Sequence, residues 1–298
     1  MSKAIVIGSR GSDLALWQAN YTKDQLEKLG HSVTIKIIKT QGDRIQHLSF
    51  DKLEGKGFFT KEIEEQLLSG AIDVAVHSHK DLETTPPAGL LIAAVPEREA
   101  PSDLLLIKKD KVDASKQFSL AEGAIVGTSS ARRKNQIKAF RPDVELADIR
   151  GNVPTRIEKL RTESFDAIML AKAGVVRLEL DLSDFHVEEL NPKEFIPAPA
   201  QGALGLQIRE DDADMKAILS NLNDKSAASR IQIERKVLNL FQGGCQLPLG
   251  VYVEADGDEF NLWASLANKW EDMPRRIQIS GRADQLAVSA VEELKKKS

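Results

Sequence analysis

Short runs of β-branched and aliphatic residues alternate with longer amphipathic stretches over the first two-thirds of the chain. A short run rich in Val and Ile is typical of a buried strand, while apolar residues at three- and four-residue intervals are typical of a helix. This alternation predicts α/β domains with largely parallel sheets. Strands are expected at 4–9, 33–40, 71–78, 89–96, 124–130, 144–151, 166–174 and 203–208, and helices at 14–30, 58–70, 131–140 and 155–163.

Two proline-rich stretches interrupt this alternation. Residues 96–105 and 191–203 combine several prolines with a loss of periodicity, which is typical of connections rather than packed elements. Two crossings between the same pair of domains predict that the first domain is discontinuous. We therefore expect domain 1 at 1–98 and 199–219, with domain 2 at 104–194 inserted between them.

The order of elements changes after about residue 224, where strands and helices no longer alternate. An Asp-Gly dipeptide at 256–257 predicts a tight hairpin. We expect a small α+β third domain at 222–298. Its elements are a helix at 226–241, a Gly-Gly-Cys loop, strands within 251–267 and at 275–281, and a closing helix at 285–297.

The composition is that of an ordinary globular protein. The chain has 298 residues, of which 42% are hydrophobic and 29% charged, and its formal net charge is −4. This charge argues against nucleic acid as a partner, because such binding needs a positive face to displace phosphate counterions. No apolar run approaches the roughly 18 residues of a membrane span and no export signal is found, so we expect a cytoplasmic protein without a membrane partner. One cysteine and five scattered histidines predict no metal site.

Three expected strands end in a Gly-, Ser- and Arg-containing turn that opens a helix. Free backbone N–H groups and the helix dipole favour an anion there, and Arg binds carboxylate or phosphate with two parallel hydrogen bonds. Each turn alone is also explained by ordinary N-caps and surface arginines, but together they lie where open α/β sheets bind ligands. Without a nucleotide fingerprint, carboxylates are the favoured ligand. The residues are Arg10, Ser12, Ser130, Arg132, Arg133, Arg150 and Arg156.

A polar loop follows the strand expected at 71–78, and it contains Lys80 and Asp81. Asp81 either caps a turn or, in a cationic cleft, stays ionised and stabilises a positively charged intermediate. The two histidines of this segment, His77 and His79, are either acid/base groups or ordinary polar residues with satisfied hydrogen bonds.

The single cysteine, Cys245, follows two glycines and precedes Pro248 and Gly250. A lone cysteine is more often a small buried apolar residue than a nucleophile. The paired glycines favour close backbone approach and an accessible sulfur, so covalent tethering of a ligand is a second interpretation.

Nine segments between residues 8 and 250 resemble, in order and at similar spacing, the porphobilinogen deaminase (hydroxymethylbilane synthase) family. They are GSRGSDLALWQA, KTQGDR, GKGFFTKEIEEQLL, DVAVHSHKDLETTPP, GTSSARRKNQI, IRGNVPTRIEKL, DAIMLAKAGVVRL, PAPAQGALGLQ and ERKVLNLFQGGCQLPLG, and GGCQLPLG is the most specific. The resemblance implies two α/β lobes like those of type II periplasmic binding proteins, an active cleft between them, and a small α+β C-terminal domain.

The resemblance also implies a transferase of tetrapyrrole and haem biosynthesis. Four porphobilinogen molecules are condensed, each with release of ammonia, onto an enzyme-bound dipyrromethane, and water then releases hydroxymethylbilane. Cys245 matches the position to which the dipyrromethane is bound through a thioether. Asp81 matches the catalytic aspartate, whose carboxylate stabilises positive charge near the pyrrole nitrogens.

The binding residues that the resemblance implies follow by motif position. Basic and hydroxyl side chains pair with the acetate and propionate groups of the pyrroles, two glutamines line the cleft, and Lys56 lies on a mobile loop over it. The carboxylate-pairing residues are Arg10, Ser12, Lys80, Ser130, Arg132, Arg133, Arg150, Arg156 and Arg177, and the glutamines are Gln18 and Gln201.

Three positions depart from the commoner family pattern. His79 stands where Met is frequent, Ala131 where Leu is frequent, and Ala200 where Gly is frequent. His79, beside a lysine and the catalytic aspartate, leads to the hypothesis of a changed pH optimum, which a pH–rate profile unaffected by His79→Met would reject. The sequence offers no physical explanation for the other two.

Two other functions would use similar features. A non-catalytic solute-binding protein for small anions also has two hinged α/β lobes, but it needs neither the third domain nor the cysteine loop. A nucleic-acid-binding protein would place the arginines on phosphates, but the net negative charge and the lack of aromatic residues around them argue against it. No long apolar surface helix is found, so we expect a monomer.

Overall fold

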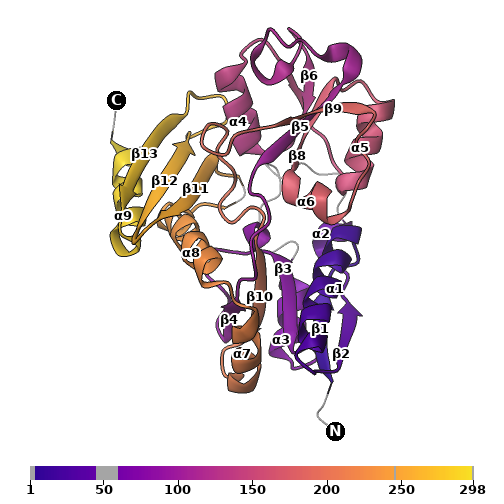
Figure 1. Cartoon of the computed structure of the whole chain (residues 1–298), viewed down its shortest axis with the longest axis vertical. Coiled ribbons are helices and arrows are strands. Elements are labelled where there is room, and N and C mark those ends of the chain that lie inside the picture. The colour runs from indigo at the N-terminus through magenta and orange to yellow at the C-terminus, as the bar shows by residue number, and fades with distance from the viewer. Residues whose placement is uncertain (1–3, 45–59, 245, 297–298) are drawn as a thin grey trace. The chain divides into compact units, whose positions relative to one another are not determined.

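The structure is a computed structural model that describes residues 4–44, 60–244 and 246–296 (Figure 1). It divides into two compact units. Unit 1 holds the described residues up to 44 together with 60–99 and 202–229, and unit 2 holds 100–201 and the described residues from 230 onward. None of the described helices is long and apolar enough to cross a membrane.

Unit 1 is built on a five-stranded sheet with the strand order β2-β1-β3-β10-β4. β1 is parallel to β2 and β3, whereas β10 is antiparallel to β3 and β4. The strands are β1 (Ile5–Ser9), β2 (Val33–Ile37), β3 (Val74–Ser78), β4 (Leu90–Ala94) and β10 (Leu204–Arg209). The helices are α1 (Asp13–Lys28), α2 (Gln41–Arg44), α3 (Lys61–Leu68) and α7 (Ala213–Leu219), with short 3-10 turns η2 (His79–Asp81) and η5 (Ser220–Leu222).

Helices cover both faces of this sheet, and alternate residues of β3 face different helices. Val74 and Val76 belong to a core with residues of α1 and α7, while Ala75 packs with Ile63 and Leu67 of α3. Because side chains alternate across a strand, His77 lies on the α3 face with Ala75, and the residue after it lies on the α1 face. The sheet therefore directs neighbouring polar residues at the end of β3 to opposite sides.

Unit 2 contains a second five-stranded sheet, with the strand order β7-β6-β8-β5-β9. Its pairing repeats that of unit 1, because β6 is parallel to β7 and β8 while β5 is antiparallel to β8 and β9. The strands are β5 (Asp103–Lys108), β6 (Ile125–Gly127), β7 (Glu145–Ala147), β8 (Ala167–Ala171) and β9 (Phe185–Glu189). The helices are α4 (Ala131–Phe140), α5 (Val153–Thr162) and α6 (Lys172–Arg177), with 3-10 turns η3 (Lys109–Lys111) and η4 (Gln117–Ser119).

Unit 2 also contains a three-stranded antiparallel sheet near the C-terminus. Leucine, valine and alanine side chains of this sheet pack against Val237 of α8 and Leu286 of α9. The expected hairpin is present: Asp256 pairs with Glu259 across a two-residue turn, in which Gly257 has φ +60°. The elements are α8 (Lys225–Leu240), β11 (Leu249–Asp256), β12 (Glu259–Leu266), β13 (Arg275–Gly281) and α9 (Ala283–Lys295).

The predicted fold class is confirmed in its α/β and α+β parts: the structure has two five-stranded α/β sheets with the same pattern of strand pairing and a small α+β part near the C-terminus. Each of the eight expected strands of the first two-thirds overlaps an observed strand, and the four expected helices overlap α1, α3, α4 and α5. Strands β5 and β9 and helices α2, α6 and α7 were missed. The three-domain boundaries at 1–98 with 199–219, 104–194 and 222–298 stay a prediction.

Candidate functional site

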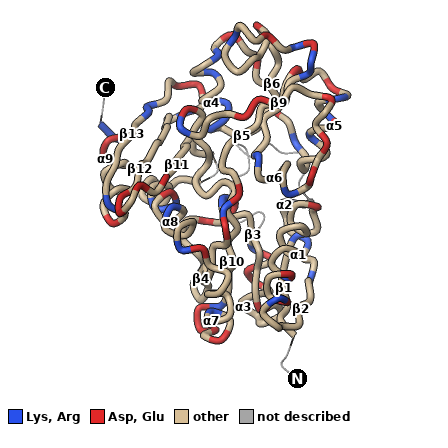
Figure 2. Tube along the Cα trace, in the orientation of Figure 1, with Lys and Arg blue, Asp and Glu red and all other residues tan. Residues whose placement is uncertain are grey.

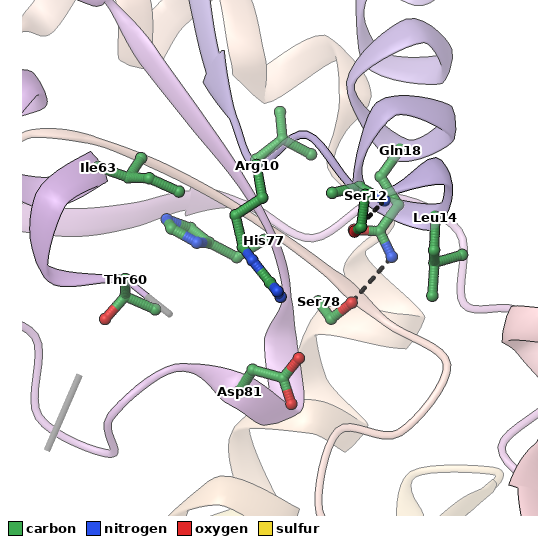
Figure 3. A pocket seen from close by; sticks show the side chains of 11 residues that line it. Arg10, Ser12, Leu14, Gln18, Thr60, Ile63, His77, Ser78 and Asp81 are labelled. Carbon is green, nitrogen blue, oxygen red and sulfur yellow. Dashed lines mark hydrogen bonds between the residues drawn. The ribbon is translucent and has the colours of Figure 1, made fainter. Parts of the chain in front are cut away.

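A pocket lies in unit 1 at the carboxyl ends of β1 and β3 (Figure 3). This is the edge at which open α/β sheets bind ligands. Residues of the β1–α1 turn, the start of α3 and the β3–η2 segment surround it. They are Arg10, Ser12, Leu14, Ala15, Gln18, Thr60, Ile63, Val76, His77, Ser78 and Asp81.

The β1–α1 turn supplies one wall of the pocket. Ser12 is the N-cap of α1, and its hydroxyl accepts a hydrogen bond from the backbone N–H of Ala15 at 3.4 Å. One turn into the helix, the buried side chain of Gln18 donates from Nε2 to Oγ of Ser78 at 2.8 Å. This contact ties α1 to the end of β3, so the two walls of the pocket are held together.

Asp81 lies on η2, directly after β3. Figure 3 shows the guanidinium group of Arg10 and the carboxylate of Asp81 extending toward the same space. A guanidinium group binds a carboxylate, and a carboxylate accepts hydrogen bonds from N–H groups. The pocket therefore suits a ligand that carries both an acidic group and an N–H donor.

The neighbouring His79 does not line this pocket. Its side chain is buried, and its ring is in contact range of the position that a Cβ atom on Gly205 would occupy. Its backbone N–H donates to the carbonyl of Ala203 at 3.0 Å, which fixes η2 against the start of β10. Lys80, between the two, is half-buried.

A buried chain of hydrogen bonds connects the pocket to α3. Nε2 of His77 lies 3.0 Å from Oε1 of Gln207, and Nε2 of Gln207 donates to Oε1 of Glu64 at 2.9 Å. Burial lowers the pKa of His77 to about 4, assisted by the positive charge of Arg10 and opposed by the hydrogen bond to Gln207. Gln207 and Glu64 were not predicted from the sequence, in which the available signal was a glutamine at a core-facing position of an otherwise apolar strand.

Unit 2 gathers three of the expected binding residues around one carboxylate, Asp103, which is fully buried at the start of β5. Arg132 donates from Nη1 to Oδ2 at 2.7 Å, and Arg133 donates from Nε and Nη2 to Oδ1 at 3.1 and 2.7 Å. Gln201 donates from Nε2 to the same Oδ1 at 3.0 Å. Burial raises the pKa of Asp103, but the charges and hydrogen bonds of Arg132 and Arg133 outweigh it and hold that pKa far below its usual range.

The other expected residues of unit 2 lie on or next to helices α4, α5 and α6. Ser130 is the N-cap of α4, with its hydroxyl accepting from the N–H of Arg133 at 3.4 Å. Nε of Arg156 donates to the carbonyl of Gly151 at 2.8 Å, and Arg177 is buried on α6. Arg150 lies in the turn between β7 and α5. Lys56 and Cys245, which were also expected at the site, lie outside the described residues.

The described residues were also searched for a basic surface and for a metal site. Lysine and arginine are interspersed with aspartate and glutamate along the trace of both units (Figure 2). Within 4–44, 60–244 and 246–296, no three His, Asp or Glu side chains are grouped so that they could hold a metal ion.

Two family profiles match consecutive parts of the chain. Residues 5–217 match the family profile described as "Porphobilinogen deaminase, dipyromethane cofactor binding domain", and residues 228–296 match "Porphobilinogen deaminase, C-terminal domain". A solved structure of an ABC-transporter periplasmic substrate-binding protein from Coxiella burnetii aligns with a TM-score of 0.44 and 13% identity, over 76% of this chain and 94% of that one.

Curated relatives carry the same family description. The porphobilinogen deaminase of Fusobacterium nucleatum is 41% identical over 304 aligned residues, covering 100% of this chain and 99% of that protein. The porphobilinogen deaminase of Nitratidesulfovibrio vulgaris strain DP4 is 47% identical, over 86% of this chain and 81% of that protein. These matches support the deaminase interpretation and not the non-catalytic alternative. The chain belongs to the porphobilinogen deaminase family.

Proposed function

We propose that the pocket of unit 1 is where this transferase binds porphobilinogen and that Asp81 is its catalytic residue. The reaction condenses four porphobilinogen molecules, with loss of ammonia, and ends in hydrolysis to hydroxymethylbilane. The observation that carries the assignment of the pocket is that the guanidinium group of Arg10 and the carboxylate of Asp81 line the same pocket at the carboxyl ends of β1 and β3 (Figure 3). Ser12 and Gln18 complete the polar lining.

The two charges of the pocket have different tasks. Porphobilinogen carries an acetate and a propionate group, and Arg10 is placed to pair with one of them through two parallel hydrogen bonds. Asp81 is placed to accept a hydrogen bond from the pyrrole N–H. As ammonia leaves, positive charge develops on the pyrrole ring, and a fixed carboxylate stabilises that charge without having to reorient.

The Asp103 cluster supports a second carboxylate-binding region, in unit 2. Two guanidinium groups share one carboxylate, so the cluster keeps an excess positive charge. Nε of Arg132 is enclosed and has no hydrogen-bond partner. A buried donor without a partner costs free energy, which a bound carboxylate would recover. We propose the same carboxylate-binding task for Lys80 in unit 1 and, in unit 2, for Ser130, Arg133, Arg150, Arg156 and Arg177. We propose Gln201 as a further lining residue and Lys56 as a further binding residue.

The dipyrromethane cofactor of the family fits this set of residues. Its acidic side chains match the guanidinium donors, and its pyrrole N–H groups match the carboxylate of Asp81. When bound, it supplies the nucleophilic pyrrole carbon that begins chain growth. We propose Cys245, the single cysteine of the chain, as the point of attachment.

Intact mass spectrometry tests the attachment. The purified wild type is expected to exceed the mass of the bare chain by two pyrrole units, because the primer is retained covalently. Cys245→Ala is expected to show the bare mass. If the wild type still has the mass of the bare chain after incubation with porphobilinogen, the proposed covalent attachment is wrong.

Replacing the catalytic carboxylate tests the role of the pocket. Asp81→Asn keeps the shape of the side chain but loses its charge, so kcat should fall by about 10²–10³-fold. The covalent mass excess, measured on the same sample, shows whether the primer is still loaded. Asp110→Asn, at an exposed position on η3, is the matched control and should retain wild-type kcat. A kcat within threefold of wild type for Asp81→Asn would reject the role.

We also propose that the protein acts in the cytoplasm as a monomer, since its reaction uses small soluble molecules and its proposed binding residues all belong to one chain. Cell fractionation tests the first statement. Light scattering after size-exclusion chromatography tests the second, and a mass of twice the 32.8 kDa of the chain would contradict it.

A further inference from the structure

His77 stands beside Arg10 on one face of the unit 1 sheet. In the parallel pairing of β1 with β3, Gly8 is opposite Ala75. His77 is two residues further along β3, and Arg10 is two residues after Gly8, directly past the end of β1. Residues two apart on an extended chain share a face. Both side chains line the pocket, which places a histidine next to the guanidinium group that faces Asp81 (Figure 3).

The hydrogen-bond chain behind His77 determines which ring nitrogen carries the proton. Gln207 donates its amide N–H to the carboxylate of Glu64, which leaves its carbonyl oxygen toward His77. A carbonyl oxygen only accepts hydrogen bonds, so Nε2 of His77 must be the protonated nitrogen. In a neutral ring the other nitrogen, Nδ1, then carries a lone pair.

That lone pair is available to a ligand. Although His77 is only 5% exposed, Nδ1 is absent from the enclosed polar atoms that lack a partner. Within the described residues, the hydrogen bond recorded for the ring is the one at Nε2. A pKa of about 4 keeps the ring neutral at neutral pH and makes it a poor base, so its chemistry is to accept a hydrogen bond and not to take a proton.

We propose that His77 is a substrate-positioning residue, held as the neutral Nε2–H tautomer by Gln207 and Glu64, whose Nδ1 accepts a hydrogen bond from an N–H group of porphobilinogen. This inference rests on the proposed binding of porphobilinogen in the unit 1 pocket. It adds a neutral acceptor beside the charged one, Asp81. The aminomethyl group and the pyrrole ring of the substrate both carry such N–H groups.

Two amide substitutions separate the two nitrogens of the ring. The amide of His77→Asn reaches the place of Nδ1 but not that of Nε2, whereas the amide of His77→Gln reaches the place of Nε2 and leaves Nδ1 without a replacement. The proposal predicts that His77→Gln raises the KM for porphobilinogen about fivefold, the effect of one neutral hydrogen bond, while His77→Asn stays within twofold of wild type.

The same two variants should rank the other way in stability. His77→Asn loses the bond to Gln207 and should unfold at a lower temperature than His77→Gln. A purely structural role for His77 would make His77→Asn the worse variant in both KM and thermal stability, and that result would overturn the proposal, as would equal KM values. His186→Gln on β9 is the matched control and should leave KM unchanged.

Nitrogen NMR of the unmodified holoenzyme gives a readout that does not depend on turnover or on a variant folding. With 15N-labelled histidine, the chain gives five imidazole side chains to assign. His77 should show a protonated Nε2 and an unprotonated Nδ1 whose resonance moves when porphobilinogen is added. A proton on Nδ1, or an Nδ1 resonance unaffected by porphobilinogen in an enzyme that turns it over, would reject this inference and leave the proposed function intact.

Discussion

His77 is a titratable residue whose burial has a measurable effect on stability. Its pKa in the folded chain is about 4, below the ordinary histidine value of 6.5. Between these values the unfolded chain binds a proton that the folded chain does not, so the stabilisation is complete above about pH 6.5 and is lost as the pH falls toward 4. The charged groups near the ring are Arg10 in the β1–α1 turn, Asp81 on η2 and, behind Gln207, Glu64 on α3.

Urea unfolding of wild type and His77→Gln from pH 7.5 to pH 4.5 measures this effect. Wild type should lose up to about 3 kcal/mol more than the variant over this range, because each pKa unit is worth about 1.4 kcal/mol. A difference between the two proteins that does not change with pH would show that His77 ionises normally in the folded chain.

Ala200, one of the unexplained departures from the family pattern, has φ +64°. This is the left-handed region that favours glycine, and the methyl group there is fully buried. Its backbone N–H donates to Oε2 of the buried Glu234 at 2.8 Å, which helps hold the strained conformation. The structure therefore explains why glycine suits this position, although nothing in it explains why this chain has alanine.

The effect of a substitution at Ala200 on the free energy of unfolding should depend on the preferred backbone conformation of the new residue and not on its size alone. Ala200→Val should destabilise the protein by about 2 kcal/mol or more, because a β-branched residue is strongly disfavoured at positive φ. Ala200→Gly, the control, should stay within about 1 kcal/mol of wild type, since the relief of strain offsets the lost methyl group and the greater freedom of the unfolded chain. Equal losses in the two variants, measured by denaturant unfolding, would contradict this account.

At the scale of elements, the strand–turn–helix units were predictable because each is local in sequence. Ser12 and Ser130 begin α1 and α4 as N-caps, and α5 begins in the same way with Asn152, which sequence analysis did not single out. A hydroxyl or amide before an amphipathic stretch is sufficient to predict such a helix start. It does not decide whether the same side chain also binds a ligand.

The missed elements and contacts have no such local signal. β5 follows Pro101 so closely that it was assigned to a connection, and α6 is too short to show helical periodicity. Glu64 and Gln207 are 143 positions apart, and only the antiparallel insertion of β10 next to β3 brings them together. Motif positions therefore predicted Arg10, Gln18 and Asp81, which line one pocket, but not the buried chain behind it.

The Asn152 cap gives a test at this scale. Its Oδ1 accepts from the backbone N–H and the hydroxyl of Thr155, at 2.9 and 2.6 Å. Asn152→Ala should lower the free energy of unfolding by about 1 kcal/mol, because the first turn of α5 loses its acceptor. Asn152→Asp keeps an acceptor and should match wild type within a few tenths of a kcal/mol. Equal stability of all three proteins would show that water replaces the cap without cost.

At the scale of the whole molecule, both chain crossings meet the Asp103 cluster inside unit 2. Gln201, on the returning segment, donates to the carbonyl of Pro101, on the outgoing segment, at 2.7 Å, and also to the carboxylate of Asp103. Arg132 donates in addition to the carbonyl of Ile196 at 3.0 Å. One buried carboxylate thus organises two arginines and both connections.

Removing that charge should be costly. Asp103→Asn leaves two buried guanidinium groups without their counter-ion, so the free energy of unfolding should fall by about 3–5 kcal/mol. Asp184→Asn, which removes the partner of the exposed Arg161, is the comparison and should cost no more than about 1 kcal/mol. Similar losses of unfolding free energy in the two variants, in denaturant titrations at one pH, would show that the charge of Asp103 stabilises the fold no more than a surface charge does.

The inserted position of β10 has a consequence for the order in which the chain is completed on the ribosome. The strands β5 to β9 form an uninterrupted run of sequence, so their sheet can close as soon as that run has emerged. The sheet of unit 1 cannot close at that stage, because the position between β3 and β4 is filled only by β10, Leu204–Arg209. At about 5–20 residues per second, β3 and β4 wait on the order of ten seconds with unpaired edges. Unit 1 therefore starts first but is completed last. Its strands β3 and β4 are the part of the chain for which protection by a chaperone during synthesis matters most.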